Sequence, residues 1–227
     1  KKLPKELISD VNSILEIDES DKVLGHELFQ GGDKEVYNMS TDIFVVDTPF
    51  LIEKLEEEAA KEEPRKLRYV LRDLAVAENA FAYEYTGYLS NIHSVKAYFD
   101  ANLDMLESQK FYKLFAPNQK IYTKVKNEEP TYYADSSDVK VSQFASGSIV
   151  RGKVEHSVIS RNVDLAEGSS VDHSVLFPRV KVAKGATVEY AIVDKGVEIA
   201  EGVTVRGTEN NPVVIKKGSV VTEDIVR

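Results

Sequence analysis

The feature that most constrains the fold is a nine-residue phrase that recurs every 17 residues in the second half of the chain. VEHSVISRN begins at Val154, VDHSVLFPR at Val171 and VEYAIVDKG at Val188. Each copy keeps the order valine, acid, aromatic ring, small residue, aliphatic pair. Within one pass the aliphatic residues lie five or six positions apart, a spacing too long for one helical turn. It suits a short strand followed by a tight turn, three times per coil.

Residues that recur at the 17-residue interval share a column from coil to coil. These columns predict a parallel β-helix of triangular section. Each strand places its aliphatic residue inward, and the coils stack at the roughly 4.8 Å spacing of neighbouring strands. About four coils are expected from Ser148 to Gly207, and after the interruption RGTENNP a further coil is expected around Ile215. The glycine column falls where a turn needs positive φ and consists of Gly168, Gly185 and Gly202. One coil cannot bury its aliphatic face alone, so several stacked coils are needed to form a core. The repeat therefore predicts a structural scaffold and does not indicate which reaction, if any, the protein catalyses.

Composition excludes several classes of function. The chain has 227 residues and no cysteine, which excludes disulfides, thiolate metal sites and a cysteine nucleophile. No apolar run approaches the roughly 20 residues of a membrane span, and the start KKLPKELISD is too charged for a signal peptide. The formal net charge is −9 without a broad basic face, so nucleic acid is not an expected partner. We therefore expect a cytoplasmic protein that binds neither nucleic acid nor membrane.

The first 108 residues alternate between strand and helix patterns. The segment Ile43–Val46 predicts a buried strand, and the helix after it has Thr48 as expected N-cap and Pro49 as first residue. PRKLRYVLRDLAVAE predicts a second helix, AFAYEY a strand, and HSVKAYFDANLDMLES a third helix capped by Ser94. This alternation favours an α/β sheet. The chain contains no glycine-rich phosphate loop.

Three regions follow from these patterns. Residues 1–108 form the expected α/β part, 109–141 a linker and 142–227 the β-helix. The expected linker carries four tyrosines able to anchor it to either part: Tyr112, Tyr122, Tyr132 and Tyr133.

Four segments resemble a known enzyme family in the same order along the chain. They are DIFVVDTPFLIEKL, GYLSNIHSVKAYFDANLDML at 87–106, PNQKIYTKVKNEEPTYY and HSVLFPRVKVAKGATVEYAIVDKGVEIAEG. All four are similar to segments of glucose-1-phosphate adenylyltransferases, and the A-Y-x-x-A-N-x-D-L-L-type helix is the most specific of them. The resemblance implies an α/β part that is a partial Rossmann-like nucleotidyltransferase domain, followed by a left-handed parallel β-helix with hexapeptide-type repeats. It also implies a C-terminal fragment of roughly the second half of such a protein.

The resemblance implies a reaction and an assembly. Family members make ADP-glucose and diphosphate from ATP and glucose 1-phosphate with Mg²⁺, for glycogen synthesis, and assemble as tetramers. This sequence departs from the catalytic pattern at three places. Asn91 occupies the position of the aspartate that holds the metal, His93 replaces the following glycine, and no lysine follows Glu27, near which the sugar-phosphate segment would fall. An amide binds Mg²⁺ far more weakly than a carboxylate does.

These departures predict a regulatory subunit that is catalytically weak or inactive. The expected partner is a catalytic adenylyltransferase subunit in a heterotetramer, with a homo-oligomer as the alternative. No catalytic residue, metal site or cofactor is expected in this part of the chain. A purely structural oligomerisation module is a further alternative, because a β-helix exposes strand edges at its ends.

Candidate anion-binding residues lie along one corner of the predicted β-helix. Arg161 and Lys195 are two coils apart and share a column, and Arg179 lies one residue off it. Together they form a candidate site for a sugar-phosphate or nucleotide effector. Lys195 matches a position at which some family members carry an effector-binding arginine. The competing interpretation is a set of solvated turn residues.

A ring column forms the last candidate. His156 and His173 share a column with Tyr190 and, two residues after an inward valine, should point outward. A histidine at a coil edge serves as general base in β-helix acyltransferases, so acyl transfer from an acyl-CoA is the alternative activity. A stacked ring column is more often a packing surface.

Overall fold

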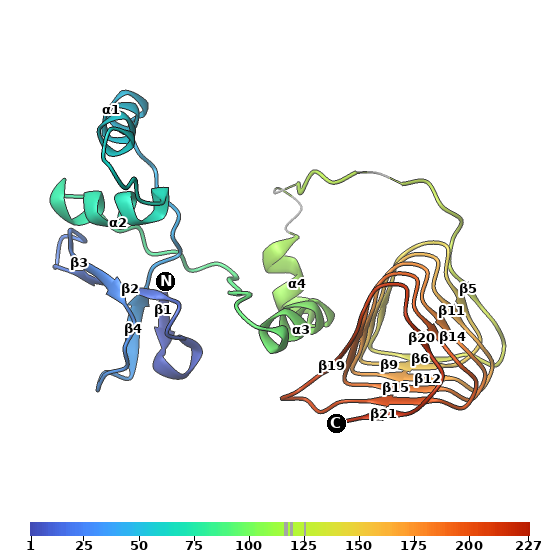
Figure 1. Ribbon diagram of the computed structural model, residues 1–227. Helices are drawn as coiled ribbons and strands as arrows, with labels where there is room; N and C mark the ends of the chain where they lie inside the picture. The colour runs from blue at the N-terminus through green and yellow to red at the C-terminus, as the bar shows by residue number, and fades with distance from the viewer. Residues whose placement is uncertain (116–117, 119, 125) are drawn as a thin grey trace. The chain divides into compact units, whose positions relative to one another are not determined.

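The chain forms two units, which are described separately. The computed structural model describes residues 1–115, 118, 120–124 and 126–227 (Figure 1). The first unit is Lys1–Thr86 and the second is Gly87–Arg227. Ala116, Pro117, Gln119 and Val125, which belong to the expected linker, lie outside the described residues.

The first unit combines a small sheet with two helices. The sheet has the order β1-β4-β2-β3, and all of its pairings are antiparallel. Helix α2 lies against β3, and Val23, Met39 and Val70 are buried. The mixture of helices and strands expected for this part is therefore confirmed. The elements are β1 (Lys2–Pro4), the 3-10 turn η1 (Lys5–Leu7), β2 (Ser13–Ile17), β3 (Val23–Leu28), β4 (Val36–Met39), α1 (Thr48–Ala59) and α2 (Leu67–Ala77).

Two expected strands are absent from this unit. The segment Ile43–Val46 has no regular structure, and Ile43 and Val45 are exposed, so the prediction of a buried strand there is wrong. The segment AFAYEY was expected as a strand and forms only the isolated bridge between Phe81 and Lys22. A strand needs a neighbour to satisfy its backbone donors and acceptors. No described strand pairs with Ile43–Val46, and beside Phe81 the pairing with the start of β3 stops after one bridge and the bonds from the Val23 and Ala82 N–H groups.

The start of α1 differs by one residue from its prediction, whereas the cap of α3 (Val95–Leu103) is confirmed. The N-cap of α1 is Asp47, whose carboxylate accepts a hydrogen bond from the Phe50 N–H at 3.1 Å. Thr48 is thus the first helical residue and not the cap. Ser94 caps α3 by accepting from the Ala97 N–H at 3.0 Å. Both caps satisfy an amide that the helix itself leaves unpaired.

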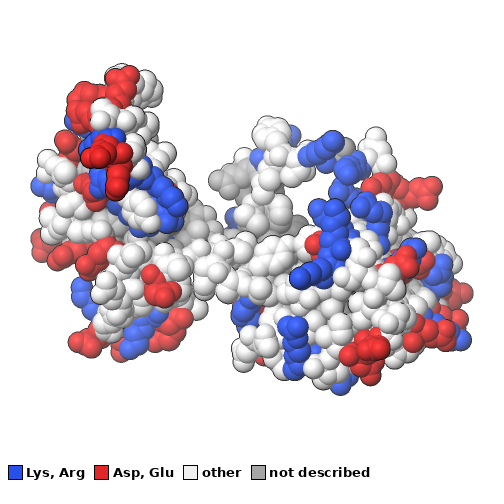
Figure 2. All heavy atoms as spheres, viewed as in Figure 1, with Lys and Arg blue, Asp and Glu red and all other residues white. Residues whose placement is uncertain are grey.

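The acidic run EKLEEEAAKEE forms the exposed surface of α1, with one exception. Figure 2 shows acidic side chains gathered over this helix. Glu58 is buried and accepts hydrogen bonds from the Arg65 Nε and backbone N–H, both at 2.9 Å, and pairs with Lys61. These donors hold the pKa of Glu58 well below its usual range. The carboxylate thus ties the chain after α1 back to the helix.

The second unit contains the parallel β-helix (Figure 1). Its strands form three faces, which we call sheets 1, 2 and 3. Sheet 1 comprises β7 (Gln143–Phe144), β10 (Val158–Ile159), β13 (Val175–Leu176), β16 (Ala191–Val193) and β19 (Val213–Ile215). Sheet 2 comprises β5 (Tyr132–Tyr133), β8 (Ile149–Val150), β11 (Asp164–Leu165), β14 (Lys181–Val182), β17 (Glu198–Ile199) and β20 (Val220–Val221). Sheet 3 comprises β6 (Asp138–Lys140), β9 (Lys153–Glu155), β12 (Ser170–Asp172), β15 (Thr187–Glu189), β18 (Thr204–Arg206) and β21 (Ile225–Val226).

The 17-residue register is confirmed in the strand pairing. Val171 lies beside Val154 on one side and Val188 on the other, and all three are fully buried. Inward valine, leucine and isoleucine columns from the three sheets form one continuous core. The interruption is also confirmed, because β18 ends at Arg206 and β19 begins at Val213. Stacking therefore buries what no single coil can bury.

The segment expected as a linker, residues 109–141, has regular secondary structure at both of its ends. It opens with α4 (Ser108–Leu114), which follows α3 and the 3-10 turn η2 (Asp104–Leu106). It closes with β5 and β6, which pair in parallel with β8 and β9. The β-helix thus begins at Tyr132, ahead of the expected boundary at residue 142, and α3 groups with it and not with residues 1–86.

Helix α3 covers part of sheet 1. Phe99 of this helix is 1% exposed and packs in one cluster with Val175 and Ile192, outward-facing residues of β13 and β16. Tyr98 stacks on Phe177 with ring centroids 6.4 Å apart. A sheet covered on both faces needs apolar residues on both faces. This requirement accounts for the consecutive aliphatic pairs in each copy of the repeat.

Candidate functional site

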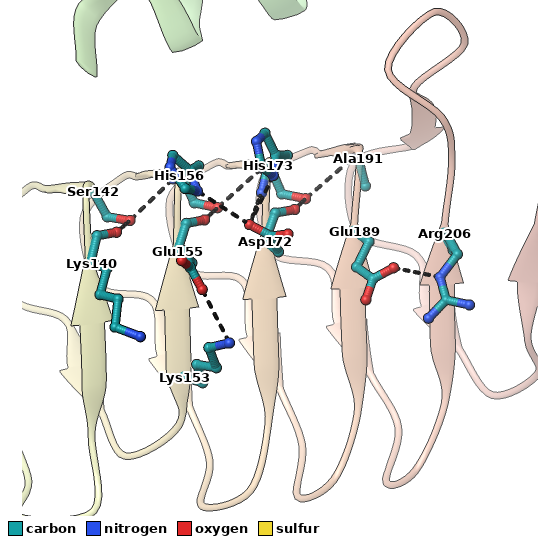
Figure 3. Close-up of polar contacts among 12 residues, drawn as sticks. Lys140, Ser142, Lys153, Glu155, His156, Asp172, His173, Glu189, Ala191 and Arg206 are labelled. Carbon is teal, nitrogen blue, oxygen red and sulfur yellow. Dashed lines mark hydrogen bonds and ion pairs between the residues drawn. The ribbon is translucent and has the colours of Figure 1, made fainter. Parts of the chain in front are cut away.

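The ring column occupies the corner where sheet 3 turns into sheet 1 (Figure 3). His156 (φ 43°), His173 (φ 39°) and Tyr190 (φ 46°) are single left-handed residues between strands. Their rings stack, with centroids 4.6 Å apart for the two histidines and 4.9 Å for His173 and Tyr190. The predicted column is thus confirmed, and it ends at the α3 cluster, in which Tyr190 takes part.

The carboxylate of Asp172 lies close to both histidine rings. Asp172 Oδ1 lies 2.9 Å from His173 Nδ1 and 3.8 Å from His156 Nδ1, and it accepts a hydrogen bond from the His173 backbone N–H. The contact at 2.9 Å does not have hydrogen-bond geometry at the ring nitrogen, and both Nδ1 atoms are buried without a hydrogen-bond partner among the described residues. The sequence analysis missed Asp172. The V-[DE]-H-S order of two copies places an acid before each histidine and could have indicated it.

A serine ladder fixes the backbone beneath this column. Ser142, Ser157 and Ser174 follow the left-handed residues of successive coils. The Ser157 hydroxyl accepts from the Ser174 N–H, and the Ser174 hydroxyl accepts from the Ala191 N–H, both at 3.1 Å (Figure 3). The hydroxyls take the place of ladder carbonyls at the corner, where positive φ breaks the strand pairing. The two imidazoles therefore stand on a rigid edge.

The candidate anion-binding residues lie at the corner between sheets 1 and 2. The Arg179 N–H donates to the Arg161 carbonyl and the Gly218 N–H to the Lys195 carbonyl, both at 3.0 Å, so these turns stack. Figure 2 shows Lys and Arg side chains gathered at this upper corner of the β-helix. Arg161 is half-buried, and its Nε lies 3.6 Å from Glu128 Oε2. Arg179 and Lys195 are exposed and have no ion-pair partner among the described residues. Arg179, at φ 64°, stands where Gly196 stands one coil later.

Asn91 lies in the irregular segment before α3. It is exposed, and its backbone carbonyl accepts from the His93 N–H at 3.1 Å. In the described part of the chain, only His156, Asp172 and His173 form a group of three histidines or acids with metal-ligand spacing. Among the described residues, Asn91 thus lies outside any group of three such side chains.

His26 is the third notable histidine and lies in the first unit. Its side chain is 0% exposed, and neither ring nitrogen has a hydrogen-bond partner among the described residues. Burial, together with the positive charge of Arg72, lowers the pKa of His26, while Asp42 at 3.9 Å and Asp73 oppose this. Burial in this unit thus disfavours the protonated form of the His26 imidazole.

Comparison with protein families gives a match for the β-helix. The GlmU-like C-terminal hexapeptide family matches residues 132–226, the span from β5 to the end of β21. In the described residues, no helix has the length and apolar character that crossing a bilayer requires.

The relatives come from one group of enzymes and related proteins. The glycogen biosynthesis protein GlgD of Bacillus subtilis (strain 168) is 34% identical over 87% of this chain and 55% of its own length. GlgD of Geobacillus stearothermophilus is 54% identical over 56% of this chain and 37% of its own length. Glucose-1-phosphate adenylyltransferase of Thermosipho africanus (strain TCF52B) is 28% identical over 58% of this chain and 32% of its own length.

The chain thus spans about half the length, or less, of the curated relatives it matches. The match to the Bacillus protein nonetheless extends over both units, since it covers most of the 227 residues. With the hexapeptide β-helix and the relatives in agreement, the chain belongs to the glucose-1-phosphate adenylyltransferase family.

Proposed function

We propose that this chain is part of a regulatory subunit of glucose-1-phosphate adenylyltransferase that acts in glycogen biosynthesis and is catalytically weak or inactive. The observation that carries the proposal is Asn91, which stands at the position of the family's metal-holding aspartate. Two relatives named GlgD, a glycogen biosynthesis protein, support the pathway. Such a role places the protein in the cytoplasm.

The chemistry explains why this substitution matters. Transfer of a nucleotidyl group builds negative charge on phosphate oxygens, and a bound metal ion is the main means of stabilising that charge. A neutral amide is a weak ligand for Mg²⁺. Because Asn91 has no acidic cluster around it in the described residues, the family's Mg²⁺ would be poorly held at this place.

The test uses the whole subunit, purified alone and together with a catalytic adenylyltransferase of the same organism. Alone, it should form ADP-glucose at a small fraction of the partner's rate in the presence of Mg²⁺. Mixed with the partner, it should form a hetero-oligomer and shift the partner's substrate or effector response. Turnover by the subunit alone that matches the catalytic protein would overturn the proposal. The variant Asn91→Asp tests the ligand position, because any residual activity should rise when the carboxylate is restored.

In this proposal, the effector binds at the corner between sheets 1 and 2. Arg161 is engaged with Glu128, so Lys195 and Arg179 are the cations available to a phosphate group. Guanidinium and ammonium groups on a rigid ledge suit a sugar phosphate or a nucleotide.

The matched variants are Lys195→Glu and Lys184→Glu. Both lysines are exposed turn residues of the β-helix, but Lys184 lies at the corner of the Gly185 column. The first variant should abolish the response of the reconstituted complex to sugar phosphates and nucleotides, and the second should leave it intact. Equal responses in both variants would show that Lys195 is only a solvated turn residue and does not bind the effector.

A structural role in oligomerisation is favoured by the last coil. In the described chain, β19, β20 and β21 are the outermost strands of their sheets and leave one edge unpaired. A groove of about 450 Å³ lies along this coil between Val214 and Ile225. Native mass spectrometry of the whole subunit, with and without the catalytic protein, separates the homo-oligomer from the heterotetramer.

A further inference from the structure

We propose that His156, His173 and Asp172 form a binding site for one divalent transition-metal ion of the zinc type, bridging two neighbouring coils of the β-helix. The site is separate from the Mg²⁺ chemistry of the family and from the proposed effector corner. Two observations on independent groups carry it: the ring nitrogens without a hydrogen-bond partner, and the carboxylate without a lysine or arginine partner, both among the described residues.

The ring nitrogens are the first observation. His156 Nδ1 and His173 Nδ1 are each buried and without a hydrogen-bond partner in the described residues. A buried polar atom normally has a partner, because leaving it unsatisfied costs free energy. Two such atoms face the same carboxylate oxygen from adjacent coils, at 3.8 and 2.9 Å. A metal ion between them would satisfy both lone pairs at once.

The carboxylate is the second observation. Three other acids of sheet 3 each lie within ion-pair distance of a lysine or arginine: Asp138 with Lys140, Glu155 with Lys153, and Glu189 with Arg206. Asp172 occupies the same register position as Glu155 and Glu189, but its ion-pair contacts among the described residues are only the two histidines. Figure 3 shows the contrast along the face of the sheet. The cation that balances Asp172 is thus missing from the protein side chains.

The spacing of the three atoms agrees with a metal site. All three ligand atoms lie within 4.8 Å of one another. Tetrahedral zinc with ligand distances near 2.1 Å requires ligand atoms about 3.4 Å apart. The distances from Asp172 Oδ1 to the Nδ1 atoms of His173 and His156, 2.9 and 3.8 Å, bracket that value. Binding therefore needs rearrangement of the side chains within the space that they already occupy.

The imidazoles must turn slightly to bind. Their rings are inclined by only 20° with centroids 4.6 Å apart, so one ion cannot lie in both ring planes as they stand. The χ2 torsion of histidine is broad, and a rotation there brings the lone pairs together at low cost. The left-handed backbone and the serine ladder hold Cα and Cβ in place, so the adjustment is confined to the rings.

The donor set selects the class of ion. Two imidazole nitrogens and one carboxylate oxygen suit Zn²⁺ and its neighbours Co²⁺ and Ni²⁺, and they disfavour Mg²⁺, which prefers oxygen ligands. Three protein ligands leave a fourth position for water or an external ligand. The ion would join the turn of one coil to that of the next.

The test uses the 227-residue chain, with any affinity tag removed and after treatment with EDTA. Titration calorimetry with Zn²⁺ should give one site per chain, and Mg²⁺ should give none. Co²⁺ should produce the visible absorption of a nitrogen- and oxygen-ligated ion. The variants His156→Gln, His173→Gln and Asp172→Asn should each weaken Zn²⁺ binding at least tenfold.

The controls are His93→Gln, an exposed histidine outside the column, and Glu155→Gln, the neighbouring acid with its own lysine. Both should keep the affinity of the unsubstituted chain. Circular dichroism in EDTA confirms that every variant is folded before titration. Absence of a stoichiometric Zn²⁺ site in the folded chain, or equal binding by the column and control variants, would overturn the proposal and leave the rings as a packing column.

Discussion

The hydroxyl of Ser157 accepts a hydrogen bond from the backbone N–H of Ser174, one coil away, at 3.1 Å. The same hydroxyl donates to the carbonyl of Glu155 in its own coil at 2.7 Å. Both serines are fully buried. A serine hydroxyl thus takes the place of a backbone acceptor after His156 and after His173, two left-handed residues 17 positions apart.

Replacing Ser157 by alanine should destabilise the β-helix. The substitution leaves the Ser174 N–H buried without a partner, which costs about 1–3 kcal/mol. Urea unfolding followed by circular dichroism gives the change in the free energy of unfolding. Ser170→Ala is the control, because this half-buried serine lies outside the ladder, and its effect should be within about 0.5 kcal/mol. Equal losses in the two variants would contradict a specific role for the ladder.

Removing the ring of Phe99 should detach α3 from sheet 1. Phe99 is 1% exposed against Val175 and Ile192, and truncation of such a buried ring costs about 3–5 kcal/mol. Hydrogen exchange should become fast in α3 while the inward core of the β-helix stays protected. Val95→Ala in the same helix is the control, since Val95 is 50% exposed. Protection of α3 in Phe99→Ala equal to that in the control would contradict the packing assigned to the helix.

His26 should make the first unit sensitive to acid. Burial and Arg72 lower the pKa of His26 in the folded chain, so the unfolded chain binds the proton more tightly. The resulting stability is present above the unfolded value of 6.5 and is lost as the pH falls from there toward the lowered folded value. Below the folded value both states are protonated, and this contribution no longer changes with pH.

The measurement is an NMR titration of the His26 ring together with hydrogen exchange in β3 at pH 7.5 and 5.5. The ring should titrate below 6.5, and the protection factors of the β3 amides, which correct for the intrinsic pH dependence of exchange, should be smaller at the lower pH. His26→Gln should remove most of that pH dependence. A ring that titrates at or above 6.5 would show that burial does not lower the pKa of His26.

Glu58→Gln should lower the melting temperature of the first unit. Arg65 and Lys61 hold the carboxylate in its charged form, and an amide cannot match these charge-assisted bonds. Glu57→Gln is the control, because Glu57 is exposed and, among the described residues, its ion-pair partner is Lys54 on the helix surface. Calorimetry of both variants at neutral pH compares them. A melting temperature as high as that of Glu57→Gln would contradict the anchoring role of Glu58.

Sequence-based prediction succeeded where the pattern is periodic and failed where it depends on partners. The β-helix and its glycine corners follow from short-range spacing, since each coil repeats the environment of the last. The strand expected at Ile43–Val46 has the right composition but no neighbouring strand to pair with in the described chain. The ring column was predicted, whereas Asp172, which joins the two histidines, was not.

The sequence alone determined the coil length, the inward valines and the family. Those properties depend on the order of residues along one strand and its turn, which 17-residue spacing repeats. Only the tertiary structure decided that α3 covers sheet 1 and that two ring nitrogens share one carboxylate. Both relationships join residues from different elements or coils, so they depend on how the coils stack and on where the side chains point. The order of residues along the chain specifies neither of these directly.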